Sequence, residues 1–411
     1  MRIRKIATSM IALGMAASPL AYATNGDEMM AVGSQSTALG GSGVAHFMGA
    51  DSVWANPAML GKSKGAEFTG GLVSFTPKVN NTGMPGGAAT DSKASTSYIP
   101  DMSYSSRMND SMTYGVSLAG IAGMGVDYTG ANATTHIKAK SALSILRVVM
   151  TMAYNKDNYG IGFSPIFQSG SLMLSYNNGA AYNAAEKKDS STSFGFTVGG
   201  YFDVAPAFTV AGAYQSKFAA KYGTQISGAG NGFGLCQPAG GGCTGAAPFG
   251  DDLDQPAQMK LGVAYTMAES FTMTADYKLI KWGSAAGYKD FAWKDQTVIA
   301  VGAKYAANGY WLGLGYNHAN DPIGTLPAAS GAAGEYRNAA INFFNNMFFP
   351  AIVTNSYTFG GGYDFSKALA VEGAAVITPK VTKTVDVMNF GGSNTTTHSQ
   401  QSYSVSLRYK F

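Results

Sequence analysis

The sequence predicts an all-β protein: a 14-stranded antiparallel transmembrane β-barrel with an N-terminal hatch segment in its lumen. Three observations predict it, namely an export leader, a low charge content and segments that alternate apolar with polar residues. Of the 411 residues, 46% are hydrophobic and only 13% are charged, against about 25% charged in ordinary soluble domains. Such a composition suits a wall with lipid on one side and a polar lumen on the other.

The N-terminus has the features of a secretory signal peptide. Arg2, Arg4 and Lys5 precede an apolar run, and Ala21-Tyr22-Ala23 supplies a cleavage site. Residues 1–23 are therefore expected to be removed, although a retained membrane anchor is the alternative. Removal leaves 25 basic residues against 24 acidic ones. A nearly neutral chain gives no reason to expect nucleic acid as a partner.

The remaining chain lacks an apolar run long enough for a transmembrane helix. The most apolar stretch, residues 142–154, is interrupted by Arg147, and a spanning helix needs about 20 apolar residues. A closed barrel is the other structure that satisfies every backbone polar group inside a membrane.

Strand segments are recognised by their period of two. The final segment places apolar side chains on one face (Tyr403, Val405, Leu407, Tyr409, Phe411) and polar ones on the other (Ser402, Ser404, Ser406, Arg408, Lys410). Residues 112–119 and 271–279 repeat this pattern. A soluble sandwich also alternates, but many such segments behind an export leader favour a barrel.

Turn chemistry gives the number of strands and the order of the elements. Short polar breaks such as Asn308-Gly309 alternate with long polar stretches, as in outer-membrane barrels. We expect long loops at 79–97, 121–139, 174–190, 218–255, 284–293, 319–352 and 381–398. We expect strands to start near 66, 99, 112, 141, 159, 192, 207, 257, 270, 294, 310, 353, 368 and 399.

Residues 24–65 have no sustained period of two and are rich in small residues. About forty such residues before the first strand could pack closely and fill the lumen. The expected organisation is therefore a signal peptide over 1–23, a hatch over 24–65 and a barrel over 66–411.

Several motifs resemble the FadL/TodX (OMPP1) family of outer-membrane transporters of hydrophobic compounds. They are Leu39-Gly-Gly-Ser-Gly-Val-Ala45, Asp51, Asn56-Pro57-Ala58, Trp293-Lys294-Asp295 and a terminal Phe411. The resemblance implies a plugged barrel in the outer membrane of a Gram-negative bacterium. It implies capture of ligand on the outer face, a pocket against the hatch, and lateral exit through a kink in the third strand.

The resemblance places a gate at the hatch and the third strand. Asn56, Pro57 and Ala58 would form a hatch segment beside the exit, although an ordinary Asn-Pro turn is the alternative. Gly115 and Gly120 could permit a bend in the third strand, or they could merely relieve crowding in the lumen.

Two groups of apolar residues are ligand-binding candidates. Met29, Met30, Phe47 and Met48 could form an adaptable lining, or simply the packed interior of the hatch. A second group has the spacing of one face of a short helix that Pro350 ends (Phe343, Phe344, Met347, Phe348). Exposed in an outer loop, it would form a capture groove; an interfacial aromatic belt or loop packing is the alternative.

Two cations could bind a carboxylate. Lys294 lies in the Trp-Lys-Asp match, and its alternative is a pair with Asp295 or a solvated charge in the lumen. Arg147 facing lipid would cost about 2–4 kcal/mol at the membrane midplane, so we expect it to point inward.

The other reactive residues predict structure rather than catalysis. Cys236 and Cys243 lie in a Gly-rich loop of an exported chain, where a disulfide is expected. The four His residues have no metal-ligand spacing, and no catalytic motif stands out. We expect no cofactor, no metal site and no enzymatic activity.

The expected function is passive transport of hydrophobic small molecules, first of all long-chain fatty acids. Aromatic or alkane hydrocarbons are the alternative substrates, an aqueous porin is a rival of the same class, and a surface adhesin or structural barrel is a rival of another class. The expected surroundings are outer-membrane lipid and lipopolysaccharide, and the chain is expected to be a monomer. Uptake of labelled oleate or toluene by knockout cells separates a transporter from an adhesin.

Overall fold

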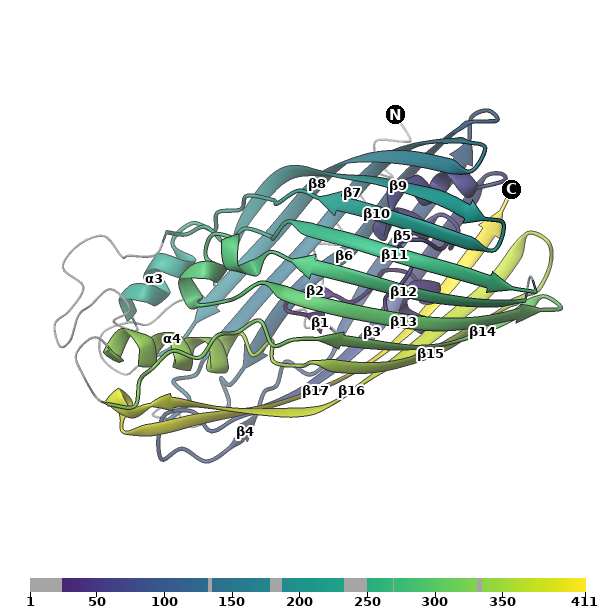
Figure 1. The fold of residues 1–411 in the computed structure, drawn as a ribbon. Helices are drawn as coiled ribbons and strands as arrows, with labels where there is room; N and C mark the ends of the chain where they lie inside the picture. Colours follow the sequence, from purple (N-terminus) through teal and green to yellow (C-terminus); the bar gives the residue numbers. More distant parts are fainter. Residues whose placement is uncertain (1–23, 132–134, 178–186, 233–249, 269, 331–334) are drawn as a thin grey trace.

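The computed structural model describes residues 24–131, 135–177, 187–232, 250–268, 270–330 and 335–411. Fourteen long strands in these residues form one antiparallel sheet that closes on itself (Figure 1). Each pairs with the next along the chain, and the last pairs with the first. The strands are β3 (Glu67–Asn81), β5 (Ser97–Arg107), β6 (Met112–Asp127), β7 (Lys140–Lys156), β8 (Tyr159–Ser175), β9 (Asp189–Ala205), β10 (Phe208–Gln215), β11 (Gln258–Met267), β12 (Phe271–Ile280), β13 (Gln296–Ala307), β14 (Tyr310–Ala319), β15 (Asn355–Asp364), β16 (Leu369–Val387) and β17 (Gly392–Lys410).

The remaining elements are short strands and helices. They are β1 (Thr24–Asn25), β2 (Glu28–Met29), β4 (Thr90–Asp91), α2 (Ser34–Ala38), α3 (Gln225–Gly232), α4 (Glu335–Phe348), and the 3-10 helices η1 (Asp51–Trp54), η2 (Pro57–Lys62), η3 (Trp282–Ser284), η4 (Tyr288–Phe291) and η5 (Met388–Phe390). Within the described ranges, no helix has both the length and the apolar character needed to span a membrane.

The alternation in sequence becomes an apolar outer wall and a polar inner wall. On β17, Tyr403 and Val405 are 52% and 60% exposed, whereas Ser404 and Ser406 are 6% and 1% exposed. Successive residues of a strand point to opposite faces, so lipid meets the aromatic and aliphatic side chains. The serines face the lumen.

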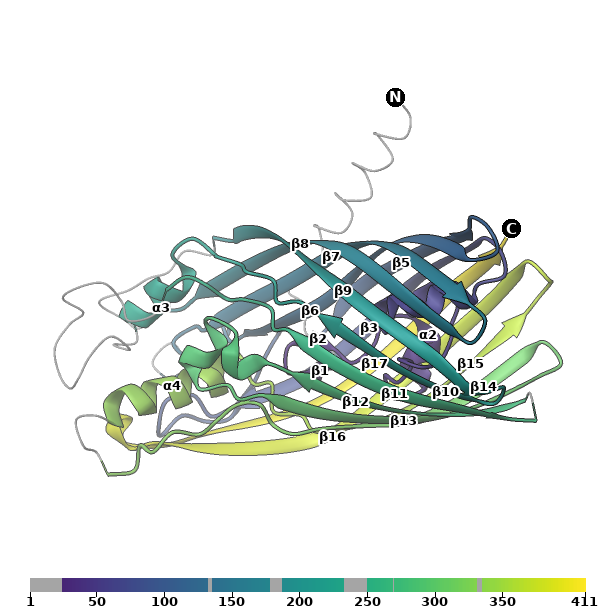
Figure 2. The same cartoon turned by 45° about the horizontal axis from the view of Figure 1, so that its top comes forward.

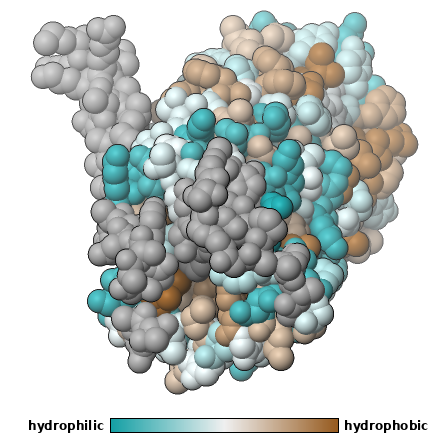
Figure 3. Space-filling model, turned by 90° about the vertical axis from the view of Figure 1, so that its left-hand side faces the viewer, coloured by the Kyte–Doolittle hydropathy of each residue, from teal (hydrophilic) through white to brown (hydrophobic). Residues whose placement is uncertain are grey.

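The two ends of the barrel differ. Short turns join the strands at the end where the chain terminates, and α3 and α4 lie at the opposite end (Figures 1 and 2). Many hydrophilic side chains lie on the face at the helix-bearing end, and hydrophobic ones occur on the receding side wall (Figure 3). This is the layout of an outer-membrane barrel, whose long loops face outward.

The predicted strand number is confirmed, and thirteen of the predicted starts lie within three residues of the observed ones. The fourteenth is wrong, because β17 begins at Gly392, and most of the predicted loop 381–398 is a paired extension of β16 and β17. The predicted loop 121–139 is also too long, since β6 continues to Asp127. Thr395, Thr396 and Thr397 are polar but β-branched, so they favour strand where polarity alone suggested a loop.

Residues 24–63 lie within the ring of strands (Figure 2). Ser34 Oγ lies 2.8 Å from Ser406 Oγ, and the Gly40 amide donates to Thr358 Oγ1 at 2.9 Å. Close approach requires glycine in the wall, because a Cβ on Gly315 would lie 2.1 Å from the Gly40 nitrogen. The segment is therefore fitted to the lumen by small residues on both sides.

Candidate functional site

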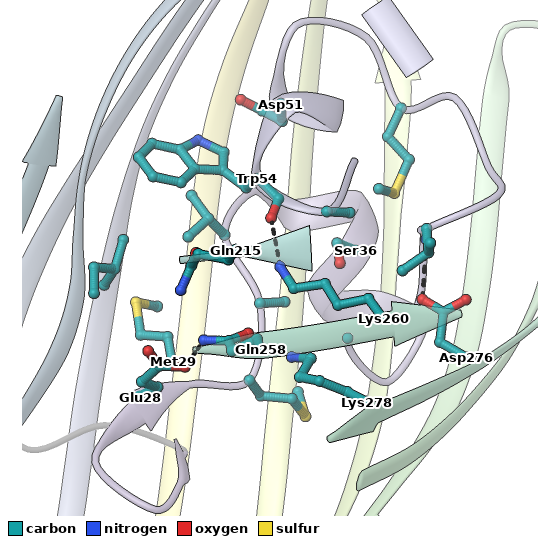
Figure 4. A pocket seen from close by; sticks show the side chains of 18 of the residues that line it. Glu28, Met29, Ser36, Asp51, Trp54, Gln215, Gln258, Lys260, Asp276 and Lys278 are labelled. Carbon is teal, nitrogen blue, oxygen red and sulfur yellow. Dashed lines mark hydrogen bonds between the residues drawn. The ribbon is translucent and has the colours of Figure 1, made fainter. Parts of the chain in front are cut away.

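A cavity of about 70 Å³ lies in the lumen between the N-terminal segment and the wall (Figure 4). The N-terminal side is largely apolar, with Met29, Met30 and Met48 among its lining residues. The wall side is polar and charged: Arg147 of β7, Gln215 of β10, Gln258 and Lys260 of β11, and Asp276 and Lys278 of β12. Ligand sites usually measure about 300–1,000 Å³, so a bound ligand requires the N-terminal segment to move.

Three cations converge on this cavity. Lys260 Nζ donates to the Trp54 carbonyl at 3.1 Å, and Arg147 Nε donates to Gln168 Oε1 at 2.9 Å. The third, Lys278, reaches the cavity from β12 (Figure 4), and no hydrogen-bond acceptor among the described residues contacts its Nζ. Lys278 Nζ and Arg147 Nη2, which also has no hydrogen-bond partner in the described part of the chain, are therefore the donors that remain available to a ligand.

The cavity also holds anions and unpartnered polar atoms. Glu28 Oε1 lies 3.8 Å from Arg147 Nη2. Glu28 Oε1, Trp54 Nε1 and Gln215 Nε2 are buried without a hydrogen-bond partner in the described part of the chain. Because buried polar groups are normally hydrogen-bonded, this side of the cavity is suited to a polar group rather than to a hydrocarbon.

Asp276 has a structural role beside these charges. Its Oδ2 accepts hydrogen bonds from the Gly43 and Val44 amides at 2.7 and 3.0 Å. The wall thereby fixes the turn that follows α2 through Oδ2, whereas Asp276 Oδ1 is buried without a hydrogen-bond partner in the described part of the chain.

The third long strand, β6, is interrupted next to the cavity. Its pairing with β7 shifts between Gly120 and Ala122, which leaves Ile121 as an extra residue. On the inside, β2 pairs with β6 through Glu28 and Ala122. The N-terminal segment therefore covers the inner side of the bulge.

The two glycines expected to bend this strand have different surroundings. Gly120 lies at the bulge. A Cβ on Gly115 would lie 2.8 Å from Leu60 Cδ1, so Gly115 makes room for η2.

Asp27 lies between the cavity and a cluster of aromatic side chains. Its carboxylate accepts a hydrogen bond from the Tyr288 hydroxyl and one from Gln255 Nε2 at 3.4 Å. Complete burial raises the pKa of Asp27 to about 7. Gly26 lies against Trp282, since a Cβ there would come within 2.7 Å of the indole ring.

The aromatic cluster surrounds a second cavity, of about 20 Å³, at the end that carries α3 and α4. Phe344 stacks on Phe291 with ring centroids 4.6 Å apart. The lining consists of Leu174, Ile226, Leu253, Tyr288, Phe291, Trp293, Phe344, Asn345 and Phe349. This cavity is lined by apolar and uncharged side chains, in contrast to the charged cavity of about 70 Å³ that Lys278 and Arg147 line.

The helix predicted before Pro350 exists as α4, but its exposed position is wrong. Phe343, Phe344, Met347 and Phe348 are at most 1% exposed. They pack beneath the outer loops because α4 lies against β16 and β17 and because the Trp293 indole donates to Asn345 Oδ1 at 3.2 Å. Aromatics that fill the mouth of the barrel are not an open capture groove.

Lys294 is exposed and does not line either lumen cavity. It precedes β13 near the outer end, and its amide donates to the Pro322 carbonyl at 2.7 Å. Asp295 pairs instead with Lys281. The structure therefore places Lys294 outside both lumen cavities, and Lys294 does not form the alternative pair with Asp295, because the Trp-Lys-Asp segment lies in a loop near the outer end of the barrel.

The remaining predicted site residues differ in whether they reach the lumen cavity. Arg147 is 4% exposed and points inward as predicted, whereas Phe47 does not line the cavity. Asn56 begins η2, because its Oδ1 accepts from the Ala58 amide at 3.0 Å; its Nδ2 donates to the Val44 carbonyl at 2.9 Å.

Some predictions lie outside the described residues, and some site residues were missed. The signal peptide and the pair Cys236 and Cys243 belong to the first group. Three residues that line the cavity, Lys260, Lys278 and Glu28, were not predicted from the sequence. Alternation could have identified Lys260 and Lys278. Their neighbours Leu261 and Tyr277 are apolar side chains expected to face lipid, so the two lysines are expected to face the lumen.

Comparisons with known proteins agree with the fold. A family model described as "Outer membrane protein transport protein (OMPP1/FadL/TodX)" matches residues 12–325. A long-chain fatty acid transport protein of Escherichia coli strain K12 is 22% identical over 315 residues, which cover 64% of this chain and 70% of the relative.

Solved structures share the fold. A FadL homologue of Pseudomonas aeruginosa superposes with a TM-score of 0.68 at 16% identity, covering 94% of this chain and all of its own. The toluene transporter TodX of P. putida superposes with a TM-score of 0.66 at 18% identity, covering 93% of this chain and 99% of its own.

Proposed function

We propose, from the premise that this chain belongs to the outer membrane protein transport family (OMPP1/FadL/TodX), that its substrates are long-chain fatty acids. Family membership fixes the coarser function, which is transport of hydrophobic compounds across the outer membrane of a Gram-negative bacterium. The family and the structural neighbours are transporters and channels rather than enzymes.

The observation that carries the proposal is the two-sided character of the lumen cavity. Lys278 and Arg147 supply positive charge on the wall side, and Met29 and Met30 supply apolar surface opposite. A fatty acid is a carboxylate joined to an alkyl chain, so each side matches one half of the substrate. Charge-assisted hydrogen bonds orient the carboxylate, and burial of the chain contributes about 0.8 kcal/mol per CH₂.

The path that follows from this placement has three stages. Ligand enters past the aromatic cluster around Phe344, displaces the stretch that contains Asp27, and settles with its carboxylate toward Lys278. It then leaves sideways at the Ile121 bulge into the membrane. A lateral exit keeps the alkyl chain away from water, which explains why a transporter would cover a wall defect with its own N-terminus.

The N-terminal segment acts in this proposal as a hatch with a fixed base. Asn56 and the residues that follow, Pro57 and Ala58, hold η2 against β8 and β9, where a Cβ on Gly162 would lie 2.4 Å from the Ala58 nitrogen. Closure of the lumen by this base is what separates a selective transporter from an aqueous porin.

Aromatic hydrocarbons are the second candidate substrates. The apolar cavity between Trp293, Phe291 and Phe344 favours them, because aromatic rings attract one another in stacked and edge-on arrangements. A neutral arene would need this upper cavity and would gain nothing from Lys278.

Lys278→Met separates the two substrates. The variant keeps the length of the side chain but removes the ammonium group, so we expect oleate uptake to fall about tenfold or more, the typical effect of losing a hydrogen bond to a charged group. Toluene uptake should be unchanged. The measurement is uptake of both labelled compounds by cells that lack other transporters of this kind.

Lys294→Met is the matched control, because Lys294 is exposed outside both cavities. Oleate uptake should survive this change. If Lys278→Met takes up oleate at the rate of the unmodified protein, the carboxylate site is wrong. Uptake of toluene but not of oleate by the unmodified protein would favour the arene.

A further inference from the structure

A polar groove of about 420 Å³ lies on the outer surface of the barrel, away from the lumen cavities. It crosses four neighbouring segments, from β16 over β17 and β3 to the loop that carries β4, near the helix-bearing end of the molecule (Figure 1). Its lining includes Thr76, Lys78, Asp91, Ser95, Ser399 and Gln401. Hydroxyl, amide and ammonium groups therefore dominate a surface that elsewhere faces lipid.

The groove lies at the outer border of the apolar belt. On β17, the outward side chains from Phe411 back to Tyr403 are apolar or aromatic, and the next ones, Gln401 and Ser399, are polar. At about 3.3 Å per residue and a tilt of about 40°, that apolar stretch spans about 20 Å of the membrane normal. On β3 the change comes one outward pair closer to the short-turn end, between Leu72, which is 49% exposed, and Ser74, which lies opposite Tyr403.

One lysine, Lys78, lines the groove, and a second, Lys380, lies beside it on the neighbouring strand. Lys78 is exposed on β3 and pairs across the ladder with Ser399. Lys380 is exposed in a bulge of β16, where Pro379 and Lys380 lie opposite the same Ser399. The carboxylate in the lining, Asp91, accepts a hydrogen bond from Asn80 Nδ2 at 2.9 Å, so part of its charge is already engaged.

We propose that this groove binds the phosphorylated sugar headgroup of an outer-leaflet glycolipid. Its height is that of the lipid headgroups, the two lysines match phosphate, and its serine, threonine and glutamine side chains match sugar hydroxyls and phosphate oxygens. Lys78 in the groove and Lys380 beside it stand at the edge of the apolar belt, the level at which lipid phosphates lie. The site is independent of the transported substrate, since no residue of the lumen cavity contributes to it.

The test is binding of glycolipid to the complete purified protein in detergent. The probe is lipopolysaccharide with both phosphates on its lipid anchor, compared with the same glycolipid after enzymatic removal of the phosphates and with inorganic phosphate alone. The variant is Lys78→Ala with Lys380→Ala. The matched control is Lys156→Ala with Lys367→Ala, which removes two exposed lysines from the opposite end of the wall.

We expect each of the two lysines to strengthen binding about fivefold, as is typical of basic residues at an anionic lipid surface. The double variant should therefore bind the phosphorylated glycolipid about 25-fold more weakly, and the control should bind it normally. Equal binding by the variant, an equal loss in the control, or no difference after phosphate removal would overturn the proposal. So would inorganic phosphate that displaces the glycolipid completely at millimolar concentration.

Thermal midpoints of the variants show whether they are folded. Both lysines are exposed, so the midpoint without glycolipid should not change. If both double variants have a lowered thermal midpoint, the test uses Lys78→Arg with Lys380→Arg instead. This variant keeps both charges and should bind the phosphorylated glycolipid normally. Weak binding by this variant would count against the site.

Discussion

At the scale of single residues, charged side chains line the lumen cavity, and burying a charge costs free energy. Lys278, Arg147 and Glu28 share one cavity, and a buried charge requires a partner or a change of protonation. Arg147 has Gln168 and Gln215 as acceptors. Lys278 has none among the described residues, so it is the position at which an anionic ligand gains most.

Asp27 gives a pH-dependent prediction. Its pKa in the folded protein is about 7 against an ordinary value of 3.8, because the carboxylate is buried. Between these values the folded state holds the proton more tightly than the unfolded state, so this residue lowers stability as the pH rises. We expect Asp27→Asn to raise the thermal midpoint at pH 8, corresponding to up to about 4 kcal/mol.

At pH 5 the advantage of the same variant should shrink to about 1.6 kcal/mol, because Asp27 is protonated in the folded protein but mostly ionised in the unfolded chain, and it should vanish below about pH 4. Thermal melting in detergent from pH 5 to pH 8 measures this difference. Asp110→Asn, at an exposed turn, is the control and should leave the pH profile unchanged. A constant offset between Asp27→Asn and the unmodified protein at every pH would contradict the explanation.

At the scale of elements, the interrupted strand β6 and the short strand β2 form one unit. The bulge at Ile121 breaks the ladder with β7, and the Gly123 amide donates to the Asp27 carbonyl at 2.9 Å. The N-terminal strand thus pairs with β6 just beyond Ala119, where pairing with β5 ends, and withdrawing it would leave this stretch of β6 unpaired on that side.

Deleting Ile121 tests this unit. Without the extra residue, β6 and β7 can pair without interruption, so we expect a barrel of equal or greater thermal stability with oleate uptake reduced at least fivefold. Ile121→Ala is the control, because it shortens the side chain and keeps the bulge. Uptake that is unaffected by the deletion would show that the exit lies elsewhere.

At the scale of the whole molecule, residues 34–63, the base of the proposed hatch, are hydrogen-bonded to strands on several sides of the ring. The residues near Ser34 bond to β17, those near Gly40 to β15, and Asn56 to β9. Arg408 of β17 also donates to the Met48 carbonyl at 3.1 Å. Withdrawal of the complete hatch would break all these bonds at once, so we expect only residues before Ser34 to move.

Engineered disulfides test which part moves. Ser34→Cys with Ser404→Cys joins the base to β17, where the two hydroxyl oxygens lie 3.0 Å apart, and oleate uptake should persist. Glu28→Cys with Gln258→Cys joins the moving stretch to β11, and uptake should stop until a reductant is added. Uptake by cells before and after reduction measures this, with each single cysteine as control. Loss of uptake in the first pair would show that the base itself must move.

Particular residues show how far sequence reasoning reached. Alternation located the wall strands, because lipid and lumen impose opposite polarity on neighbouring residues. The cost of a charge facing lipid implied that Arg147 points inward. Alternation failed at residues 381–398, which continue as strands above the membrane, where both faces are polar and the pattern loses contrast. It also failed at Lys294, because no local pattern reports how far a loop residue lies from the lumen.

The sequence by itself determined the export leader prediction, the class of fold, the number of strands and the polarity of each wall face, since all of these follow from local periodicity and composition. Only the tertiary structure decided that Lys278, Arg147 and Glu28 share a cavity, that the aromatics of α4 are buried, and that β2 covers the bulge at Ile121. These are contacts between segments far apart in the chain. They depend on the curvature of the closed sheet and on the path of the N-terminal segment inside it, and neither leaves a periodic trace.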